Sequence, residues 1–237
     1  MADVSGVWVK VYPDAVSGDG APEGLNVTAV FDEDASTGIT FTDVLDPDGD
    51  GLNYRLATCT DGASLVLSAG GEARCLVIGG GGGGGREMQG GGAGQMIDLK
   101  LSLPIGAHLI TVGTGGGAGN WGGSPTGHGT PSSIGTEVEA MNGFGGGKNG
   151  YQFGGGGMGA AGDLSNFGSG RSNTGGAGAC GTGAATGKNS NITGTDVLYA
   201  CGGGTANPGS GGGGSGGQVS GGAGQPGVVL VRVRVDD

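Results

Sequence analysis

Three aspartates stand two residues apart in the stretch DPDGDGLNYRLA, and carboxylates at this spacing can hold a calcium ion. Asp46, Asp48 and Asp50 occupy the first, third and fifth places of a calcium-binding loop, and Gly51 occupies the sixth. The twelfth place, where such loops use a bidentate glutamate, is Ala57, and no helical pattern flanks the loop. We therefore expect a solvated Asp-Gly turn, with a Ca²⁺ site as the alternative and no other cofactor.

A second candidate is the run CLVIGGGGGGG, which with Asp98 about twenty residues further on has the outline of a dinucleotide-binding fingerprint. In such a site the glycine turn opens a helix, whose N-terminus holds the pyrophosphate. Here Gly85 is followed by REMQGGGAGQ, where each glycine would cost a helix about 1 kcal/mol and no apolar stripe compensates. No GK[ST] follows either. The sequence thus argues against a nucleotide site.

The remaining polar residues do not form a catalytic pattern. The two histidines, His108 and His128, have no cysteine at a metal-like spacing, and no GxSxG motif surrounds a serine. Glu137 and Glu139 could form a carboxylate pair, but a spacing of two also places both on the outer face of a strand. We expect no enzymatic activity.

The cysteines are Cys59, Cys75, Cys180 and Cys201, and none of them belongs to a CxxC motif. We expect them to be small buried residues in a chain made in a reducing compartment. The alternative pairs Cys59 with Cys75 and Cys180 with Cys201 in two disulfides.

Composition excludes several classes of protein. The chain has 237 residues, of which 66 are glycine and 8 proline, and a formal net charge of −11. Collagen would need abundant proline with glycine at every third position, and nucleic-acid binding would need clustered cations. No apolar run approaches the roughly twenty residues that span a bilayer, and the N-terminus lacks the pattern of a secretory signal. We therefore expect a soluble protein made in a cytosol, without a nucleic-acid partner.

The elements that must position these residues are strands. Residues 1–70 contain short runs rich in β-branched and aromatic residues between turn residues, which predicts a small N-terminal β domain. Residues 71–237 form a second, glycine-rich domain that begins and ends with a strand, and we expect residues 74–79 to pair with residues 228–235. Between them QMIDLKLSL and AHLITVG, on either side of PIGA, predict a hairpin. The fold class is all-β.

Glycine itself is expected to be the architecture of the second domain. Polyglycine II helices have three residues per turn and no internal hydrogen bonds, so their N–H and C=O groups can bond to neighbouring helices. Only a dense lattice of such bonds could offset the entropy cost of ordering glycine. Disorder is the alternative that composition leaves open.

Four landmarks within about residues 73–235 resemble a known family. They are, in order, CLVIGGGGGGG, GGGAGQMIDLKLSLPIGAHLITVGTGGGAG, GTPSSIG and GGSGGQVSGGAGQPGVVLVRV. They look like the glycine-rich domain found in many bacteriophage tail proteins, and the chain is also similar in style to the tip adhesins of T-even phages, whose polyglycine II helices carry receptor-reading loops. The resemblance implies a structural or receptor-binding role in a virion.

We therefore expect a minor tail protein on the outer surface of a phage particle, at or near the tail tip, which contributes to host attachment. A capsid fibre or decoration protein is the first alternative, and a non-phage adhesin or ice-binding protein the second. The expected partners are other tail or capsid proteins and a host cell-surface receptor. Residues 1–70 would dock to the particle. We expect a homo-oligomer, most simply a trimer, with Trp8, Tyr12 and Phe31 near the subunit contact or the docking surface.

Six aromatic residues on glycine-flanked islands are the candidates for receptor binding, because aromatic side chains on small-residue loops give contact area at low entropy cost. The alternative is that they plug the ends of the glycine lattice or pack under a neighbouring subunit. They are Trp121, Phe144, Tyr151, Phe153, Phe167 and Tyr199.

Overall fold

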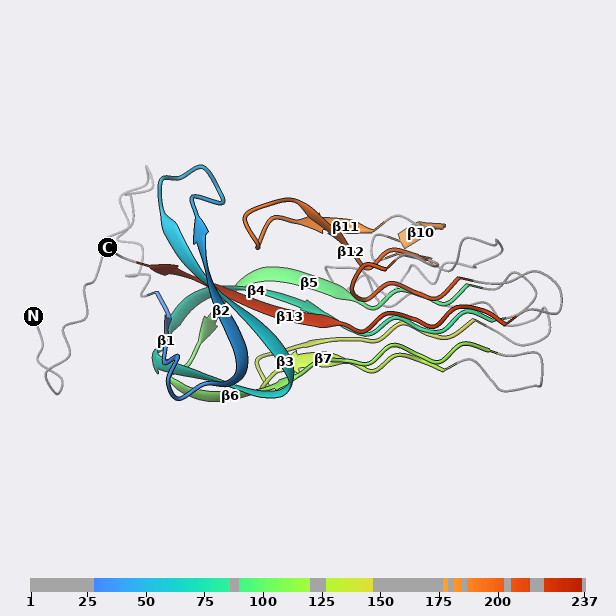
Figure 1. Ribbon diagram of the computed structural model, residues 1–237, viewed down its shortest axis with the longest axis horizontal. Helices are drawn as coiled ribbons and strands as arrows, with labels where there is room; N and C mark the ends of the chain where they lie inside the picture. Colours follow the sequence, from blue (N-terminus) through green and yellow to red (C-terminus); the bar gives the residue numbers. More distant parts are fainter. Residues whose placement is uncertain are drawn as a thin grey trace, which may run out of the picture.

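The computed structural model of the chain describes residues 28–85, 90–119, 127–146, 177–178, 181–184, 187–202, 206–213 and 220–235. This part of the chain contains thirteen strands and no α-helix or 3₁₀-helix, which confirms the all-β class. Strands gather at one end of the molecule, and extended glycine-rich segments run side by side toward the other end (Figure 1). Within the same ranges, no helix is long and apolar enough to cross a membrane.

Nine strands form one large antiparallel sheet that is nearly closed like a barrel. The strand order is β5-β4-β13-β3-β6-β7-β8, and β1 and β2 also pair with β3. The strands are β1 (Val30–Phe31), β2 (Thr37–Leu45), β3 (Asn53–Ala69), β4 (Gly71–Ile78), β5 (Met96–Leu103), β6 (Gly106–Thr111), β7 (Ser132–Ile134), β8 (Val138–Ala140) and β13 (Val228–Val235).

Two small two-stranded sheets complete the described structure. The first is formed by β9 (Ala177–Gly178) and β10 (Gly181–Ala184). The second is a hairpin of β11 (Lys188–Ser190) and β12 (Val197–Tyr199), which packs on the large sheet beside β4 and β5.

The last strand lies in the centre of the large sheet. On one side β13 pairs with β4, from Val228 opposite Ile78 to Arg232 opposite Arg74. On its other side β13 pairs with the first half of β3. The prediction that the two bracketing strands pair is therefore confirmed, and the chain closes its glycine-rich region at both ends on one sheet.

The predicted hairpin between QMIDLKLSL and AHLITVG is wrong. The two runs do form β5 and β6, but β5 pairs with β4 and β6 pairs with β3. At the corner, the turn at Pro104 and Ile105 lies directly against Gly70, where an added Cβ would stand 2.7 Å from the backbone nitrogen of Ile105. Strand periodicity predicts a strand but not its partner, because either neighbour buries the same alternating side chains.

The boundary expected at residue 70 falls between two strands of one sheet. The long strand β3 pairs with β13 through residues 53–59 and with β6 through residues 64–67. Strands from before and after residue 70 therefore share hydrogen bonds and a core throughout the described part of the chain.

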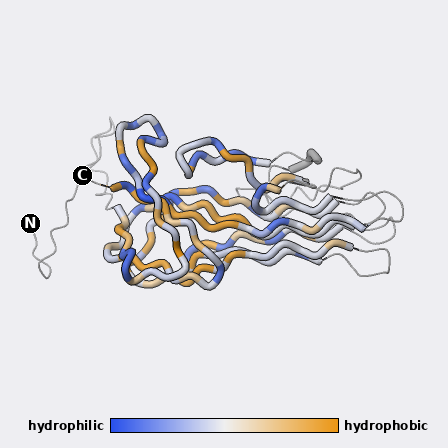
Figure 2. Tube along the Cα trace, viewed as in Figure 1, coloured by the Kyte–Doolittle hydropathy of each residue, from blue (hydrophilic) through white to orange (hydrophobic). Residues whose placement is uncertain are grey.

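Each face of the large sheet has its own core. The inner core contains Leu65, Leu67, Val77, Val229 and Val231, with their neighbours in the closed half of the sheet. The outer core lies where the β11–β12 hairpin covers the opposite face, and its members include Leu56, Leu76, Ile78, Met96, Ile192, Tyr199 and Leu230. Apolar colour is concentrated in this strand half of the chain trace (Figure 2).

Residues 79–84 continue β4 as the central helix of a glycine lattice. Their N–H groups donate, in turn, to the carbonyl oxygens of Gln95, Thr130, Gln225, Gly92, Gly127 and Gly222, over 2.7–3.0 Å. The carbonyl oxygens of residues 80–84 accept, in turn, from the N–H groups of Gly143, Gly116, Gly212, Gly146 and Gly119. The partners repeat every third residue and lie in other segments, as expected for polyglycine II.

Six segments surround this central helix as a closed ring. Each neighbouring pair in the ring is joined by a backbone hydrogen bond, including the last segment with the first. The central helix donates to the three segments that run antiparallel to it and accepts from the three that run parallel. In order around the ring, the segments are 90–95, 141–146, 127–131, 113–119, 220–227 and 209–213.

The absence of side chains in the central helix is a requirement of this packing. A Cβ added at any residue from Gly79 to Gly84 would overlap the carbonyl oxygen of a parallel neighbour. Ser132 ties the sheet to the lattice, since its buried Oγ donates to the Ile78 carbonyl oxygen over 2.6 Å and accepts from the Gly113 N–H over 2.8 Å. The predicted ordered lattice is thus confirmed for these segments.

Candidate functional site

The structure describes two of the six aromatic residues that the sequence singled out for receptor binding. Phe144 lies on the surface of the lattice with 41% of its side chain exposed. Tyr199 is only 4% exposed and packs from β12 into the outer core. The other four, Trp121, Tyr151, Phe153 and Phe167, lie outside the described residues.

Phe144 forms a pair that the sequence did not suggest. The His128 ring meets the Phe144 ring edge to face, with their centroids 5.3 Å apart. Nδ1 of His128 also accepts a hydrogen bond from the Gly145 N–H over 3.0 Å. The two residues lie on adjacent segments of the lattice ring, a relation that appears only once the three-residue hydrogen-bond repeat is known.

Of the other aromatics expected at a contact surface, Trp8 and Tyr12 lie outside the described residues. Phe31 is half-buried and packs against Phe41, with ring centroids 5.2 Å apart, at the margin of the inner core. Part of its ring is therefore already used within the chain.

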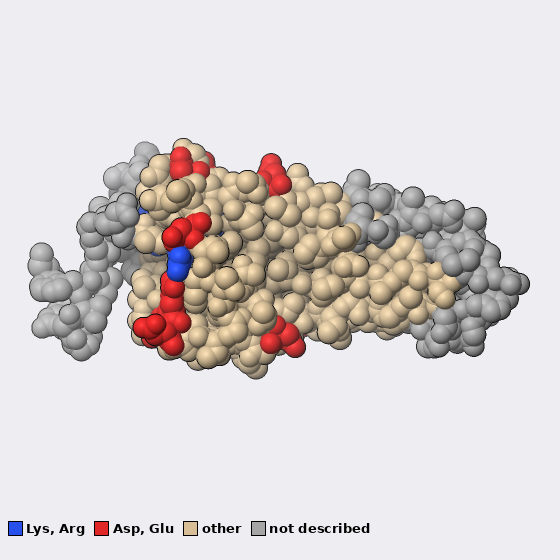
Figure 3. Space-filling model, in the orientation of Figure 1, with Lys and Arg blue, Asp and Glu red and all other residues tan. Residues whose placement is uncertain are grey.

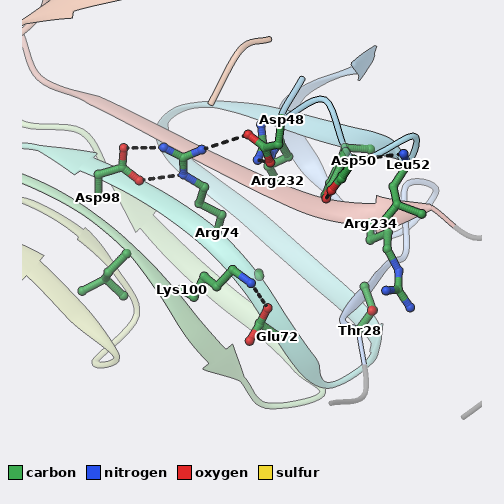
Figure 4. A pocket seen from close by; sticks show the side chains of 13 residues that line it. Thr28, Asp48, Asp50, Leu52, Glu72, Arg74, Asp98, Lys100, Arg232 and Arg234 are labelled. Carbon is green, nitrogen blue, oxygen red and sulfur yellow. Dashed lines mark hydrogen bonds and ion pairs between the residues drawn. The ribbon is translucent and has the colours of Figure 1, made fainter. Parts of the chain in front are cut away.

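The described charged residues lie over the strand half of the molecule. On the face shown in Figure 3, no acidic side chain lies on the described part of the lattice half. Beyond the β11–β12 hairpin, the outer face of the large sheet holds a polar pocket of about 540 Å³. We call it the arginine pocket (Figure 4). It is lined by Thr28, Asp48, Asp50, Leu52, Tyr54, Glu72, Ala73, Arg74, Asp98, Leu99, Lys100, Arg232 and Arg234.

A row of three cations crosses the floor of the arginine pocket. Lys100 on β5 stands opposite Arg74 on β4, and Arg74 stands opposite Arg232 on β13. Like charges placed directly opposite on neighbouring strands repel each other. Arg232 is only 3% exposed, and its guanidinium lies over the Tyr54 ring, 4.5 Å from the centroid. The row therefore depends on carboxylates to balance its charge.

Asp98 balances Arg74. Its two oxygens accept from Nε and Nη2 of Arg74 over 2.8 and 2.9 Å, and Oδ2 also accepts from the Ser190 hydroxyl over 2.6 Å. Burial alone would raise the pKa of Asp98, but the hydrogen bonds from Arg74 and Ser190 hold that pKa below its usual value. The aspartate that could have matched a nucleotide fingerprint is thus a counter-ion.

Asp48 balances both arginines. Its carboxylate forms an ion pair with Arg232, accepts from Nδ2 of Asn191 over 3.0 Å, and lies 3.8 Å from Nη1 of Arg74. This contact holds the β2–β3 loop against the sheet and the turn of the β11–β12 hairpin. Sequence spacing drew attention to this aspartate but could not reveal its partners.

The neighbouring residues Asp46 and Asp50 stabilise the turn between β2 and β3 by accepting hydrogen bonds within it. Asp46 accepts from the Gly51 N–H, and Asp50 accepts from the Leu52 N–H and the Tyr54 hydroxyl, over 2.6–2.9 Å. No group of three or more metal-ligating side chains occurs in the part of the chain that the structure describes. Two arginines beside Asp48 also disfavour a cation there. The hydrogen bonds are those of an Asp-Gly turn.

Cys59, Cys75 and Cys201 are free and buried, whereas Cys180 lies outside the described residues. The alternative disulfide between Cys59 and Cys75 is therefore not formed. The two residues lie on β3 and β4, with β13 between them. Burial raises the pKa of each of these two thiols to about 12, which keeps them protonated and unreactive.

His108 and Glu137 meet in the interior. Nδ1 of His108 lies 3.5 Å from the Glu137 carboxylate, and its Nε2 lies 2.9 Å from the Pro104 carbonyl oxygen. Glu139, which the sequence offered as a partner of Glu137, is exposed on β8. Both ring nitrogens of His108 thus face acceptors within the fold.

The geometry defines a class of protein, an antiparallel β-sheet that carries a closed ring of polyglycine helices around a central one. The sequence matches the glycine-rich domain family over residues 58–234, about three quarters of its length. The chain therefore belongs to the glycine-rich domain family. The match begins inside β3 and ends in β13, so it spans the lattice and the central strands of the sheet. No curated protein matches the sequence.

The ion pair between Asp98 and Arg74 is expected to make the stability of the protein depend on pH. Replacing Asp98 by asparagine is expected to lower the free energy of unfolding at pH 7 by about 2 kcal/mol, because Arg74 loses a charged partner. The pKa of Asp98 is lowered by folding, so its contribution is present above the unfolded pKa of about 4 and is lost as the pH falls through the folded value. Urea unfolding of both proteins between pH 7 and pH 2 measures this.

The matched control is Asp34→Asn, at an exposed position. We expect this variant to unfold like the unchanged protein across the same range. A loss for Asp98→Asn that stays constant down to pH 2 would contradict the role given to its charge.

Proposed function

We propose that this chain is a structural protein of a bacteriophage particle, placed at or near the tail tip, and that it contributes to host attachment. The support is the order of its sequence landmarks, which resembles phage tail proteins, together with its membership of the glycine-rich domain family. The sheet would be the docking end and the lattice the outward end.

The observation that carries the proposal is the arrangement of the lattice segments. The central segment 79–84 and the parallel ring segments 113–119, 141–146 and 209–213 all run away from the sheet (Figure 1). In the sequence, Trp121 follows segment 113–119, and Tyr151, Phe153 and Phe167 follow segment 141–146. A closed ring of backbone hydrogen bonds is a rigid support, as a recognition surface requires.

The rest of the proposal concerns assembly. Other tail or capsid proteins would contact the sheet end, where Val30, Leu45 and Ile105 are exposed large apolar residues. A homo-oligomer, such as a trimer, would bury these residues and the free strand edges together. Sedimentation of the purified chain measures its oligomeric state.

The experiment uses phage particles that carry the gene for this chain. We expect an antibody against the chain to label the tail tip, and Trp121→Ala to reduce adsorption to host cells at least about tenfold, as loss of a central aromatic contact does. Met141→Ala, which truncates an exposed side chain on the side of the lattice, is the matched control and should leave adsorption unchanged.

Label on the head would instead favour a capsid fibre or decoration protein. Label nowhere on the particle contradicts the proposal and leaves the non-phage adhesin or ice-binding protein as the next candidate. Equal adsorption of the Trp121 and Met141 variants would remove the attachment role from the lattice end.

A further inference from the structure

We propose that the arginine pocket binds the anionic group, a carboxylate or a phosphate, of a small polar ligand. The inference goes beyond the proposed function, since the pocket lies on the outer face of the sheet and not on the lattice. It stands or falls independently of whether the chain belongs to a phage particle.

The first step compares the hydrogen-bond acceptors and donors of the pocket. Three of its carboxylates already accept hydrogen bonds, whereas one buried arginine nitrogen has no acceptor among the described residues. The oxygens of Asp98, Asp48 and Asp50 all accept hydrogen bonds from neighbouring groups of the protein. Nε of Arg232, in contrast, is buried and has no acceptor in the part of the chain that the structure describes. A buried donor without an acceptor is costly, and an anionic ligand would supply the acceptor.

The second step is the geometry of the cations. Lys100, Arg74 and Arg232 stand side by side on three adjacent strands, a span of about 10 Å at the usual strand spacing. Arg234, which also lines the pocket, lies two residues beyond Arg232 on the same strand. Guanidinium groups are suited to carboxylates and phosphates, to which they donate parallel hydrogen bonds.

The third step limits the size and charge of the ligand. A volume of about 540 Å³ lies in the range of small-molecule sites. Four carboxylates, on Asp48, Asp50, Glu72 and Asp98, stand among the cations, and the whole chain has a net charge of −11. A polyanion would be repelled by this field. One anionic group on a molecule with hydroxyl groups, such as a sugar acid or a sugar phosphate, fits the lining best.

Calorimetric titration of the purified full-length chain at low salt tests the proposal. The probes are glucuronate for the carboxylate, glucose 6-phosphate for the phosphate, and glucose as the neutral comparison. We expect at least one of the two anions to bind and glucose to bind at least about tenfold more weakly. The anion that binds more tightly shows whether the pocket recognises a carboxylate or a phosphate.

Variants locate the site. Arg234→Gln and Lys100→Gln should each weaken anion binding about tenfold. Arg55→Gln is the matched control, because Arg55 lies outside the pocket lining and pairs with Glu33 and Asp43. If Arg234→Gln does not fold by circular dichroism, Lys100→Gln decides, since its side chain is 72% exposed.

Three outcomes would overturn the proposal. The first is that neither anion binds at millimolar concentration, and the second is that glucose binds as tightly as the anions. The third is that the pocket variant and Arg55→Gln lose the same affinity, which would show binding through net charge alone.

Discussion

Replacing Gly83 by alanine is expected to lower the free energy of unfolding by about 3 kcal/mol or more. Gly83 lies in the central helix, where an added Cβ would overlap the carbonyl oxygen of Gly117. All six surrounding segments are joined to one another, so no backbone can yield without breaking hydrogen bonds elsewhere in the ring. Equilibrium denaturation followed by circular dichroism measures the effect.

The matched control is Gly117→Ala, made in a ring segment of the same lattice. Gly117 is exposed, and a Cβ added there would meet no atom within 4 Å. We expect its effect to stay within about 0.5 kcal/mol, as for most surface substitutions. Equal stabilities of the two variants would mean that the central packing is not close. Gly156, another glycine suited to such a test by sequence alone, lies outside the described residues.

Deletion of residues 228–237 is expected to unfold the whole chain, because it removes the strand between β3 and β4. Both neighbours would lose their hydrogen bonds, and both cores would lose members. A single substitution in β13 tests the same role of this strand without shortening the chain. Val231→Asp would bury a charge in the inner core and should destabilise the protein by about 4 kcal/mol or more.

Val235→Asp, on the same strand, provides the comparison for Val231→Asp. Val235 is 40% exposed at the end of β13, so an aspartate there can stay hydrated. Resistance to protease and the thermal unfolding midpoint measure all three proteins. A truncated chain that keeps the protease resistance of the full chain would refute the central role of β13.

The sheet and the lattice are expected to unfold together. The central segment 79–84 continues directly from β4, and segments 90–95 and 220–227 lead directly into β5 and β13. Each strand therefore fixes the position and direction of the glycine segment that adjoins it. This arrangement reduces the entropy that the lattice itself must overcome, which is large for glycine.

The sequence by itself determined the elements that depend on local pattern. Alternation of valine and arginine in β13 indicated a strand with two different faces, and Val231 and Val233 do face the inner core. Glycine runs between strands indicated packing of backbone on backbone, since no side chains were available for a core there. These predictions succeeded because side-chain period and the absence of Cβ are properties of the chain itself.

Only the tertiary structure decided which segments meet. Strands β5 and β6 were predicted as a hairpin but pair with β4 and β3, because strand pattern does not select a partner. The lattice ring has the same property, since all of its segments are rich in glycine and a glycine run does not select a partner. Arg74, Asp98 and Asp48 likewise form one cluster from three separate segments, and Arg74 was not singled out by any motif. Long-range contacts depend on how the whole chain packs. The local sequence pattern of a segment does not specify which distant segment it will contact.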